Sequence, residues 1–264
     1  MIKNVFGRQV FDSRGNPTVE AEVRTEFGTF SAIVPSGAST GAYEAVELRD
    51  AGADYHGKGV LKAIENINSK IAKKVVGLDE KEQFKIDEMM VSIDGTKNKS
   101  NLGANAILAV SMAIARAGAK SANLRLFEYL SKLYNSLTSE KGNNAIGTKA
   151  INFVMPCPCF NVIHGGAHAG NELDIQEYMI VPANAKSFSE AMKIGTEIYH
   201  TLKDILKKRF GPNSINVGDE GGFAPPLKSA KEPLILIMEA IKTAGYTGKV
   251  KIALDIAASE FFEE

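Results

Sequence analysis

The sequence predicts an α+β domain followed by the opening part of a TIM-type α/β barrel, which is incomplete in this chain. Residues 3–34 alternate apolar and polar side chains as strands do, and residues 57–135 repeat apolar side chains at helical spacing. After residue 150 the order becomes strand, strand, helix, helix, strand. Because a complete barrel needs roughly 250 residues, the 114 residues from 151 to 264 form either the first part of a barrel or a smaller fold.

A polar stretch separates the two predicted domains. Residues 136–150, SLTSEKGNNAIGTKA, are rich in Ser, Thr, Asn and Gly, which is typical of a boundary between domains. We therefore expect an N-terminal α+β domain over residues 1–138 and the first part of the barrel over residues 139–264.

The first domain is predicted to contain a β-hairpin and at least two helices. In TVEAEVRT, the apolar side chains of Val19, Ala21 and Val23 lie on one side, and FGTFSAIVP returns after a glycine-containing turn. The segment LKAIENINSKIAKKV has one apolar stripe, formed by Leu61, Ile64, Ile67 and Ile71. NLGANAILAVSMAIARAGAKSA is apolar nearly all round, which predicts a buried helix.

The second domain is predicted to begin with two strands, CFNVIHGG and LDIQEYMIVP, and to continue with two helices. Ser187 and Glu190 fit a capping box at the start of the first helix, and Gly211-Pro212 ends it. The second helix is predicted to pack through one apolar face, formed by Leu234, Ile237, Met238 and Ile241. KVKIALDIAAS is typical of a strand buried on both faces, as in a parallel sheet.

Composition argues against several classes of function. The 31 basic residues balance 31 acidic residues, so the net charge of zero argues against a nucleic-acid or membrane-surface partner. No apolar run approaches the roughly 20 residues of a membrane span, and the first residues do not resemble a signal peptide. Cys157 and Cys159 are expected to be unpaired and reduced, which fits a cytoplasmic protein.

A segment rich in Gly, Ser and Thr, VPSGASTGAYEA, offers oxygen ligands. It lacks the spacing of a phosphate-binding P-loop. The hydroxyl groups of Ser36, Ser39 and Thr40 are of the kind that Mg²⁺ accepts beside a substrate phosphate. The alternative is a flexible exit from the hairpin that binds nothing.

Two histidines and two further polar residues lie in HGGAHAGNELDIQEYMI. His164 and His168 have the spacing of a helical zinc pair, but the glycines around them argue against a helix and therefore against zinc. We expect a histidine there to meet a ligand or to be exposed. Gln176 and Glu177 follow inside an apolar strand, where a carboxylate must be paired or must bind something. The alternative for Glu177 is a buried structural carboxylate.

Other acidic residues lie at a strand end and in a loop. Asp255 ends a predicted strand, where barrel enzymes keep catalytic groups, and a helix N-cap is its alternative role. The segment INVGDEGGFAPP, predicted to be a loop between the helices, places Asp219 and Glu220 among glycine and proline. A solvated turn is the alternative there. Taken together, these residues favour divalent-metal chemistry on an anionic substrate.

Six motifs occur in one order along the chain. They are FDSRGNPTVE (11–20), SGASTGAYEA (36–45), GANAILAVSMA (103–113), HAGN with QEYMIVP (168–182), VGDEGGFAP (217–225) and LDIAASEF (254–261). With them the whole sequence resembles the enolase family, whose members dehydrate 2-phosphoglycerate to phosphoenolpyruvate in glycolysis. The resemblance implies an N-terminal α+β domain and a barrel that opens with strand, strand, helix, helix.

The resemblance also implies roles for single residues. Glu220 matches the general acid that protonates the departing hydroxyl, with Glu177 assisting it. His168, Gln176 and Glu177 match groups around the substrate. We expect burial and neighbouring negative charge to keep Glu220 protonated near neutral pH.

Two Mg²⁺ ions per active site are implied by the resemblance, as is general for enolases. Asp255 matches the first of three carboxylates that hold the structural Mg²⁺. Ser39 matches the loop residue that ligates a second Mg²⁺ when the loop closes over substrate. The two ions neutralise the charge that develops on the substrate carboxylate when the neighbouring proton is removed.

Other parts of the family's site match no position in this chain. These are the catalytic lysine, two metal carboxylates and the phosphate-binding groups. We therefore expect the 264 residues to be a fragment or a truncated product without turnover. The resemblance implies a homodimer. Two alternatives stay open, namely another metal-dependent lyase of the enolase superfamily and a truncated, non-catalytic paralogue that acts as an interaction module.

Overall fold

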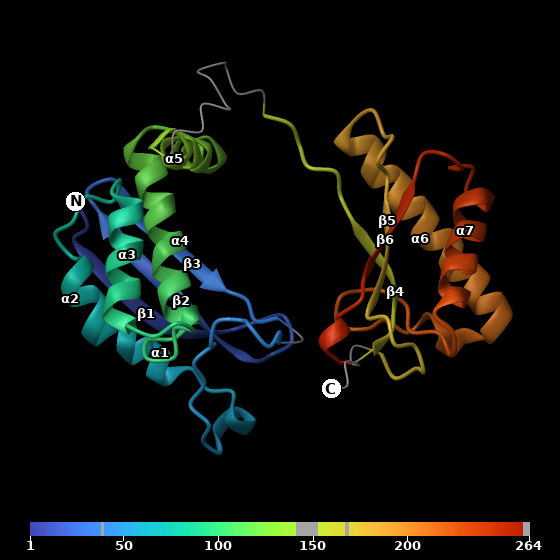
Figure 1. Cartoon of the computed structure of the whole chain (residues 1–264), viewed down its shortest axis with the longest axis horizontal. Helices are drawn as coiled ribbons and strands as arrows, with labels where there is room; N and C mark the ends of the chain where they lie inside the picture. The colour runs from blue at the N-terminus through green and yellow to red at the C-terminus, as the bar shows by residue number, and fades with distance from the viewer. Residues whose placement is uncertain (38–39, 141–152, 167–168, 261–264) are drawn as a thin grey trace. The chain divides into compact units, whose positions relative to one another are not determined.

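The chain forms two compact units, Met1–Ala150 and Ile151–Glu264. A computed structural model describes residues 1–37, 40–140, 153–166 and 169–260 (Figure 1). Each unit has its own hydrophobic core, as expected for separate domains. The predicted boundary at 136–150 lies mostly outside the described residues, and its first residues, to Glu140, are helical.

The first unit is built on a three-stranded antiparallel sheet in the order β1-β2-β3. The strands are β1 (Asn4–Phe11), β2 (Pro17–Thr25) and β3 (Gly28–Val34). The predicted alternation is confirmed, because Val19, Ala21 and Val23 are all fully buried. The opposite face of β2 is charged, and Glu20 and Glu22 there form ion pairs with Arg8 of β1.

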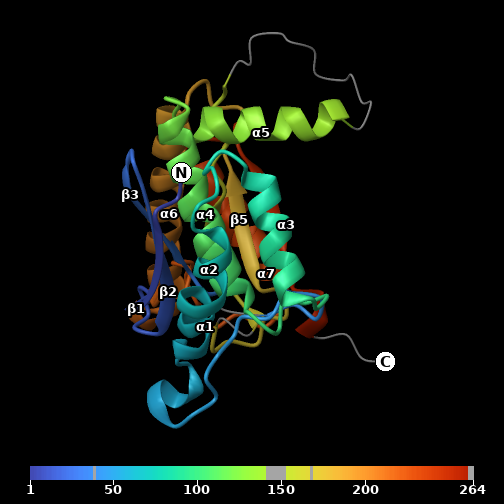
Figure 2. The same cartoon turned by 90° about the vertical axis from the view of Figure 1, so that its left-hand side faces the viewer.

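Helices cover one face of this sheet (Figure 2). Those against the strands are α1 (Leu61–Asn66), a π-helical turn (Ile67–Ile71), α2 (Ala72–Val75) and α4 (Ala104–Ser121). Helices α3 (Gln83–Asp94) and α5 (Leu126–Glu140) pack on α4, and a short 3₁₀ turn lies at Asp54–Gly57. The predicted buried helix is confirmed as α4, which packs on β2 and β3 and whose buried residues are mostly alanines.

One residue of the predicted apolar stripe is misplaced. Ile67 and Ile71 are fully buried, but the Leu61 side chain is 61% exposed. The buried face of this helix is centred on Ala63 and Ile67. At the helical rotation of about 100° per residue, Leu61 lies about 120° away from Ile67 and faces solvent.

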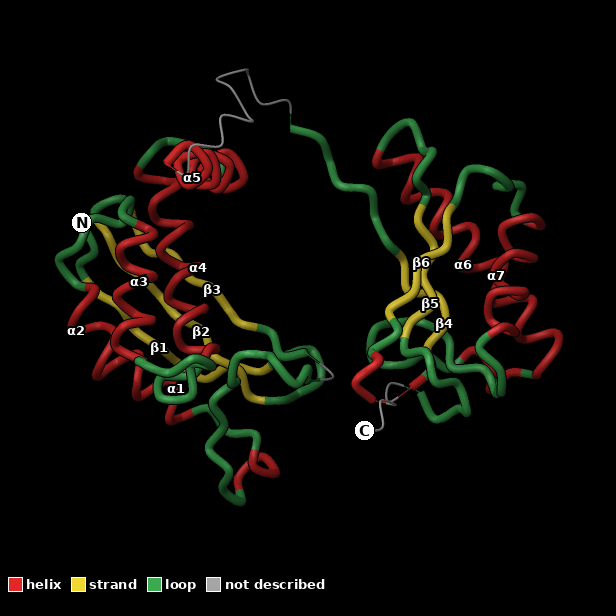
Figure 3. Tube along the Cα trace, in the orientation of Figure 1, coloured by secondary structure: helices red, strands yellow, loops and turns green. Residues whose placement is uncertain are grey.

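The second unit contains a three-stranded sheet in the order β4-β5-β6, with its two long helices on one side (Figure 3). Its elements are β4 (Phe160–His164), β5 (Glu177–Val181), α6 (Phe188–Phe210), a 3₁₀ turn at Pro212–Ile215, α7 (Lys231–Thr243), β6 (Lys251–Asp255) and a 3₁₀ turn at Ala258–Glu260. The predicted order of strand, strand, helix, helix, strand is confirmed.

The prediction of a parallel strand buried on both faces is wrong for β6. This strand pairs antiparallel with β5, and Lys251, Leu254 and Asp255 are exposed. Within the described residues β6 is an edge strand, so one side of it pairs and the other does not. Because β4 also pairs antiparallel with β5, β4 and β6 run in the same direction.

The ends of α6 follow the predicted capping. The Ser187 side chain accepts a hydrogen bond from the Glu190 backbone N–H at 3.1 Å, as an N-cap does. The Glu190 carboxylate in turn accepts from the Lys186 N–H at 2.7 Å, one residue earlier than in a standard capping box. Gly211 ends the helix with a φ of 84°, which favours glycine.

The packing face of α7 is only partly as predicted. Ile237 and Ile241 are buried, but Met238 is 63% exposed and Leu234 is only partly buried. The other buried positions lie one residue towards the N-terminus of the expected ones and are Pro233, Leu236 and Ala240. Both sets of positions fit helical spacing, so periodicity alone does not separate them.

Close packing around Gly118 of α4 makes a testable prediction. A Cβ atom there would lie 2.5 Å from the Tyr129 Oη atom and 2.8 Å from the Glu80 backbone oxygen. Gly118→Ala should therefore destabilise the first unit by about 1–3 kcal/mol through overpacking, although alanine is favoured over glycine in helices by about 1 kcal/mol. Urea unfolding followed by circular dichroism measures the change. Gly52→Ala, where a Cβ would meet nothing within 4 Å, is the matched control and should be nearly neutral; a Gly118→Ala variant of unchanged or higher stability would contradict the packing.

Candidate active site

Three of the strand ends in the second unit meet at one end of the sheet. Glu177 is the first residue of β5 and pairs with His164, the last residue of β4. On its other side Glu177 pairs with Asp255, the last residue of β6. Residues directly opposite on neighbouring strands have side chains on the same face. The reversal of β5 thus places an acid from its amino end beside the carboxyl ends of β4 and β6.

The loop that carries Glu220 is attached to the edge of β4. Phe223 donates its N–H to the Val162 oxygen at 3.0 Å, and its own oxygen accepts from the His164 N–H at 2.8 Å. These bonds form a parallel bridge between Phe223 and Ile163. The predicted interhelical loop is confirmed. It is attached to β4 at Ile163, one residue before His164, which pairs with Glu177.

A tight glycine turn holds Glu220 at the tip of this loop. The Gly221 N–H bonds to the Gly218 oxygen at 3.1 Å, and the Gly218 N–H bonds to the Gly222 oxygen at 2.8 Å. Gly221 has a φ of 85°, which an L-residue adopts only with strain. Gly222 packs so closely that a Cβ would lie 2.7 Å from the His164 ring and 2.8 Å from the Asn161 side-chain oxygen. The glycines therefore bring the acid-bearing turn against the end of β4.

Glu177 and Glu220 share a side-chain hydrogen bond. The Glu177 side chain is only 9% exposed. Burial raises the pKa of Glu177 to about 8, with further contributions from the hydrogen bond and charge of Glu220 and from the charge of Asp255. Two carboxyl groups hydrogen-bond to each other only when one carries a proton. The arrangement therefore stores a proton near neutral pH.

The expected burial is found at the partner carboxyl and not at Glu220 itself. Glu220 is exposed, because it lies at the tip of the turn. Glu177 is buried, because it lies within the sheet and is flanked by strands on both sides. The expectation that burial of Glu220 keeps it protonated is thus wrong for the described residues, whereas the proximity of other acids is found.

Gln176 and His164 are both buried at this end of the sheet. Gln176 is 4% exposed, and its side-chain oxygen has no hydrogen-bond partner among the described residues. Of the two alternatives for a histidine in this segment, exposure does not hold for His164, which is fully buried with its Nε2 atom 3.3 Å from the Asn161 Nδ2 atom; contact with a ligand stays a prediction. His168 lies outside the described residues.

The two predicted metal ligands are only partly placed by the structure. Asp255 is exposed, and its Oδ1 atom accepts from the Ala257 N–H at 3.2 Å, which bends the chain after β6. Ser39 lies outside the described residues. The neighbouring Ser36 is placed, and its hydroxyl donates to Glu47 at 2.7 Å.

The carboxylate oxygens at the strand ends are of the type that binds a hard cation. The described residues supply too few of them for a complete site. Carboxylate oxygens are the ligands that Mg²⁺ prefers. Among the residues that the structure describes, no group of three or more His, Cys, Asp and Glu side chains could hold a metal ion. The described residues would therefore supply part of a magnesium site, and they do not form a zinc site.

Asn171 is a site residue to which sequence reasoning assigned no role. Its side-chain Nδ2 donates to the His164 oxygen and to the Pro225 oxygen, both at 3.0 Å. It therefore ties the end of β4 to the loop that carries Glu220. The asparagine stands in the HAGN motif, but nothing in the motif alone indicates two backbone carbonyls as its partners.

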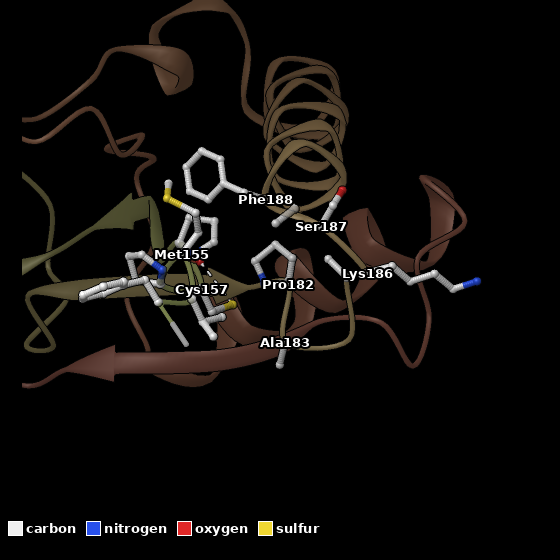
Figure 4. A pocket seen from close by; sticks show the side chains of 13 residues that line it. Met155, Cys157, Pro182, Ala183, Lys186, Ser187 and Phe188 are labelled. Atoms are coloured by element: carbon white, nitrogen blue, oxygen red, sulfur yellow. Dashed lines mark hydrogen bonds between the residues drawn. The ribbon is translucent and has the colours of Figure 1, made fainter. Parts of the chain in front are cut away.

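The second unit also has an open pocket of about 390 Å³ away from these acids (Figure 4). One wall is the segment that includes Met155 and Cys157, and the other runs from Pro182 to Phe188. Pro182 directly follows the last residue of β5, whereas Glu177 is the first, so the pocket lies at the opposite end of that strand. Cys157 and Cys159 are both free, as predicted.

Comparison with known proteins agrees with this architecture. Two family models match the chain, the enolase N-terminal domain over residues 2–130 and the enolase C-terminal TIM barrel domain over residues 152–264. The chain is 53% identical to the enolases of Mastigamoeba balamuthi and Methanocaldococcus jannaschii and 52% identical to that of Thermococcus kodakarensis. These matches cover 99–100% of the chain but only 57–58% of each relative.

The fold and the matches define a two-domain protein, with an α+β domain followed by the first part of a TIM barrel. The chain belongs to the enolase family. Its predicted fold class and family resemblance are both confirmed. None of the helices that the structure describes combines the length and the apolar character needed to span a bilayer.

The shared proton of Glu177 and Glu220 predicts a pH-dependent stability. The raised pKa means that folded Glu177 keeps its proton from its ordinary value of 4.5 up to about 8, whereas the unfolded chain loses it near 4.5. Because the folded state then binds more protons, the free energy of unfolding of the second unit should fall as pH rises through this window. Glu177→Gln should reduce this slope, since an amide bonds to a carboxylate without a shared proton. Urea unfolding across the window, in metal-free buffer, measures the slope.

The matched control is Glu172→Gln, an exposed glutamate in the preceding loop. This variant should keep the slope of the unchanged chain. If Glu177→Gln and Glu172→Gln have the same pH dependence, the shared proton is not present.

Proposed function

We propose that this chain is part of an enolase that dehydrates 2-phosphoglycerate to phosphoenolpyruvate, and that it carries the acid side of the active site. The observation that supports this most is the hydrogen bond between Glu177 and Glu220, which requires a proton. Loss of a hydroxyl group from the substrate needs an acid, because hydroxide is a poor leaving group. A glutamate donates a proton at neutral pH only if its surroundings raise its pKa.

The two carboxyl groups take different parts in this proposal. Glu220 is exposed at the tip of its turn, so its carboxyl reaches a substrate placed at the strand ends and protonates the departing hydroxyl. Glu177 is buried behind it and holds the shared proton through their hydrogen bond. The unpartnered side-chain oxygen of Gln176 accepts a hydrogen bond from the substrate. His168, which lies between β4 and β5 in the sequence, is a further substrate-binding group.

Asp255 and Ser39 are the residues of this chain that we propose to hold Mg²⁺, one ion each. When bound, Mg²⁺ stabilises the negative charge that develops on the substrate carboxylate. Asp255 fits this role, because its carboxylate is exposed beside Glu177 at the end of β6. We further propose that the protein acts in glycolysis in the cytoplasm as a homodimer.

Replacement of Glu220 tests the proposed acid. In a full-length version, extended by the part of the barrel that the relatives have, Glu220→Gln should lower kcat by roughly 10²–10⁴-fold, the usual contribution of a general acid. The KM for 2-phosphoglycerate should change little, because Gln keeps the size of the side chain. The formation of phosphoenolpyruvate, followed by its ultraviolet absorbance, measures both. Glu172→Gln, an exposed glutamate of a neighbouring loop, is the control that should retain full activity. An unchanged kcat in Glu220→Gln would refute the assignment.

The 264 residues alone are predicted not to turn over. The chain spans only 57–58% of the length of each relative, and its described residues include no cluster of three metal-binding side chains. The purified 264-residue chain, incubated with 2-phosphoglycerate and Mg²⁺, should form no phosphoenolpyruvate, while the full-length version does so under the same conditions. Steady product formation by the shorter chain would show that it is sufficient.

A further inference from the structure

Tyr199, on helix α6, makes a direct contact with the turn that carries Glu220. Its hydroxyl donates a hydrogen bond to the Gly221 backbone oxygen at 2.8 Å. Gly221 is the residue directly after Glu220, so the bond holds the peptide group next to the proposed acid. The tyrosine and the glycine are 22 positions apart in the sequence, and no motif connects them.

The ring of Tyr199 is fixed as well as its hydroxyl. It stacks on the Phe223 ring with a centroid separation of 4.4 Å and an interplanar angle of 22°. Phe223 is 1% exposed and is bonded through its backbone to β4. Aromatic stacking of this kind leaves the ring few alternative orientations. The hydroxyl is therefore aimed at the Gly221 oxygen by a side chain that the sheet itself holds in place.

The turn needs such an anchor because of its composition. Gly218, Gly221 and Gly222 surround Asp219 and Glu220, and glycine has more backbone freedom than any other residue. Two backbone hydrogen bonds within the turn, from Gly221 to Gly218 and from Gly218 to Gly222, join glycines of the turn to each other. The bond from Tyr199 instead ties the turn to a long helix whose apolar face is buried in the core of the unit.

We infer that Tyr199 is a positioning residue, which keeps the Glu220 carboxyl at the strand ends by anchoring the peptide that follows it. This inference rests on the proposed function of Glu220. Burial raises the pKa of the Tyr199 hydroxyl, so the group remains a donor throughout the neutral range. The role is distinct from catalysis, since the hydroxyl contacts the backbone of the turn and not a reacting group.

Amide hydrogen exchange on the 264-residue chain tests the anchoring without any need for activity. Tyr199→Phe removes the hydroxyl and keeps the stacked ring. The Gly218 and Gly221 amides, which are bonded within the turn, should exchange about tenfold faster in this variant, as expected for the loss of one hydrogen bond. The Tyr178 amide in β5 should be unaffected. Tyr246→Phe is the matched control. The Tyr246 hydroxyl bonds to Glu197, which lies on α6 as Tyr199 does, and not to the turn.

Kinetics of the full-length version test the consequence for the reaction. Tyr199→Phe should lower kcat by about tenfold and leave the KM for 2-phosphoglycerate unchanged, while Tyr246→Phe changes neither. In a Glu220→Gln background the same tyrosine change should have no further effect, because the group that it positions is gone.

The two arms separate this inference from the proposed function. Unchanged exchange of the Gly218 and Gly221 amides in Tyr199→Phe would overturn the inference, and so would additive effects of the tyrosine and glutamate changes on kcat. If Glu220→Gln itself keeps full activity, the proposed function fails and the positioning role falls with it. Faster exchange would then still assign the anchoring of the turn to Tyr199.

Discussion

Antiparallel pairing of β5 with both of its neighbours is the constraint on which the candidate site depends. In a sheet of parallel strands, only carboxyl ends meet at the functional edge. Here the reversed β5 brings its first residue, Glu177, between the last residues of β4 and β6. The backbone ladder itself thus places a glutamate between a histidine and an aspartate. Moving β5 by one residue would turn Glu177 to the other face and remove it from Glu220.

The glycine turn brings a second acid, Glu220, to the end of the sheet where Glu177 lies. Like charges at hydrogen-bond distance repel each other, so two carboxyl groups meet only if they share a proton. Attachment of Phe223 to β4, the Asn171 bonds and the close contact of Gly222 with His164 all hold the turn there. These uncharged contacts thus stabilise the turn in a position where its acid lies beside a second carboxyl group.

Much of this could be predicted from the sequence, and what could not has a physical cause. Local patterns were enough for the strands around Val19, for the Ser187 cap and for the order of elements in the second unit. Local patterns are insufficient where the burial of a side chain or the direction of a strand depends on the element packed beside it. Leu61 and Met238 fit helical spacing as well as buried positions do. Strand direction was also beyond a local pattern, because KVKIALDIAAS has the same composition whether its neighbour runs parallel or antiparallel.

The unequal burial of Glu177 and Glu220 likewise depends on long-range packing and not on local sequence. A motif such as VGDEGG predicts an acid but says nothing about where its partner lies, so the sequence alone favours burial at Glu220. The fold instead buries Glu177 and leaves Glu220 exposed. This division is chemically useful, because a fully buried acid would keep its proton but could not reach a substrate. An exposed acid without a buried partner would reach the substrate already ionised. In the proposed mechanism, one acid of each kind, 43 positions apart in the chain, provides both the proton and the access to substrate.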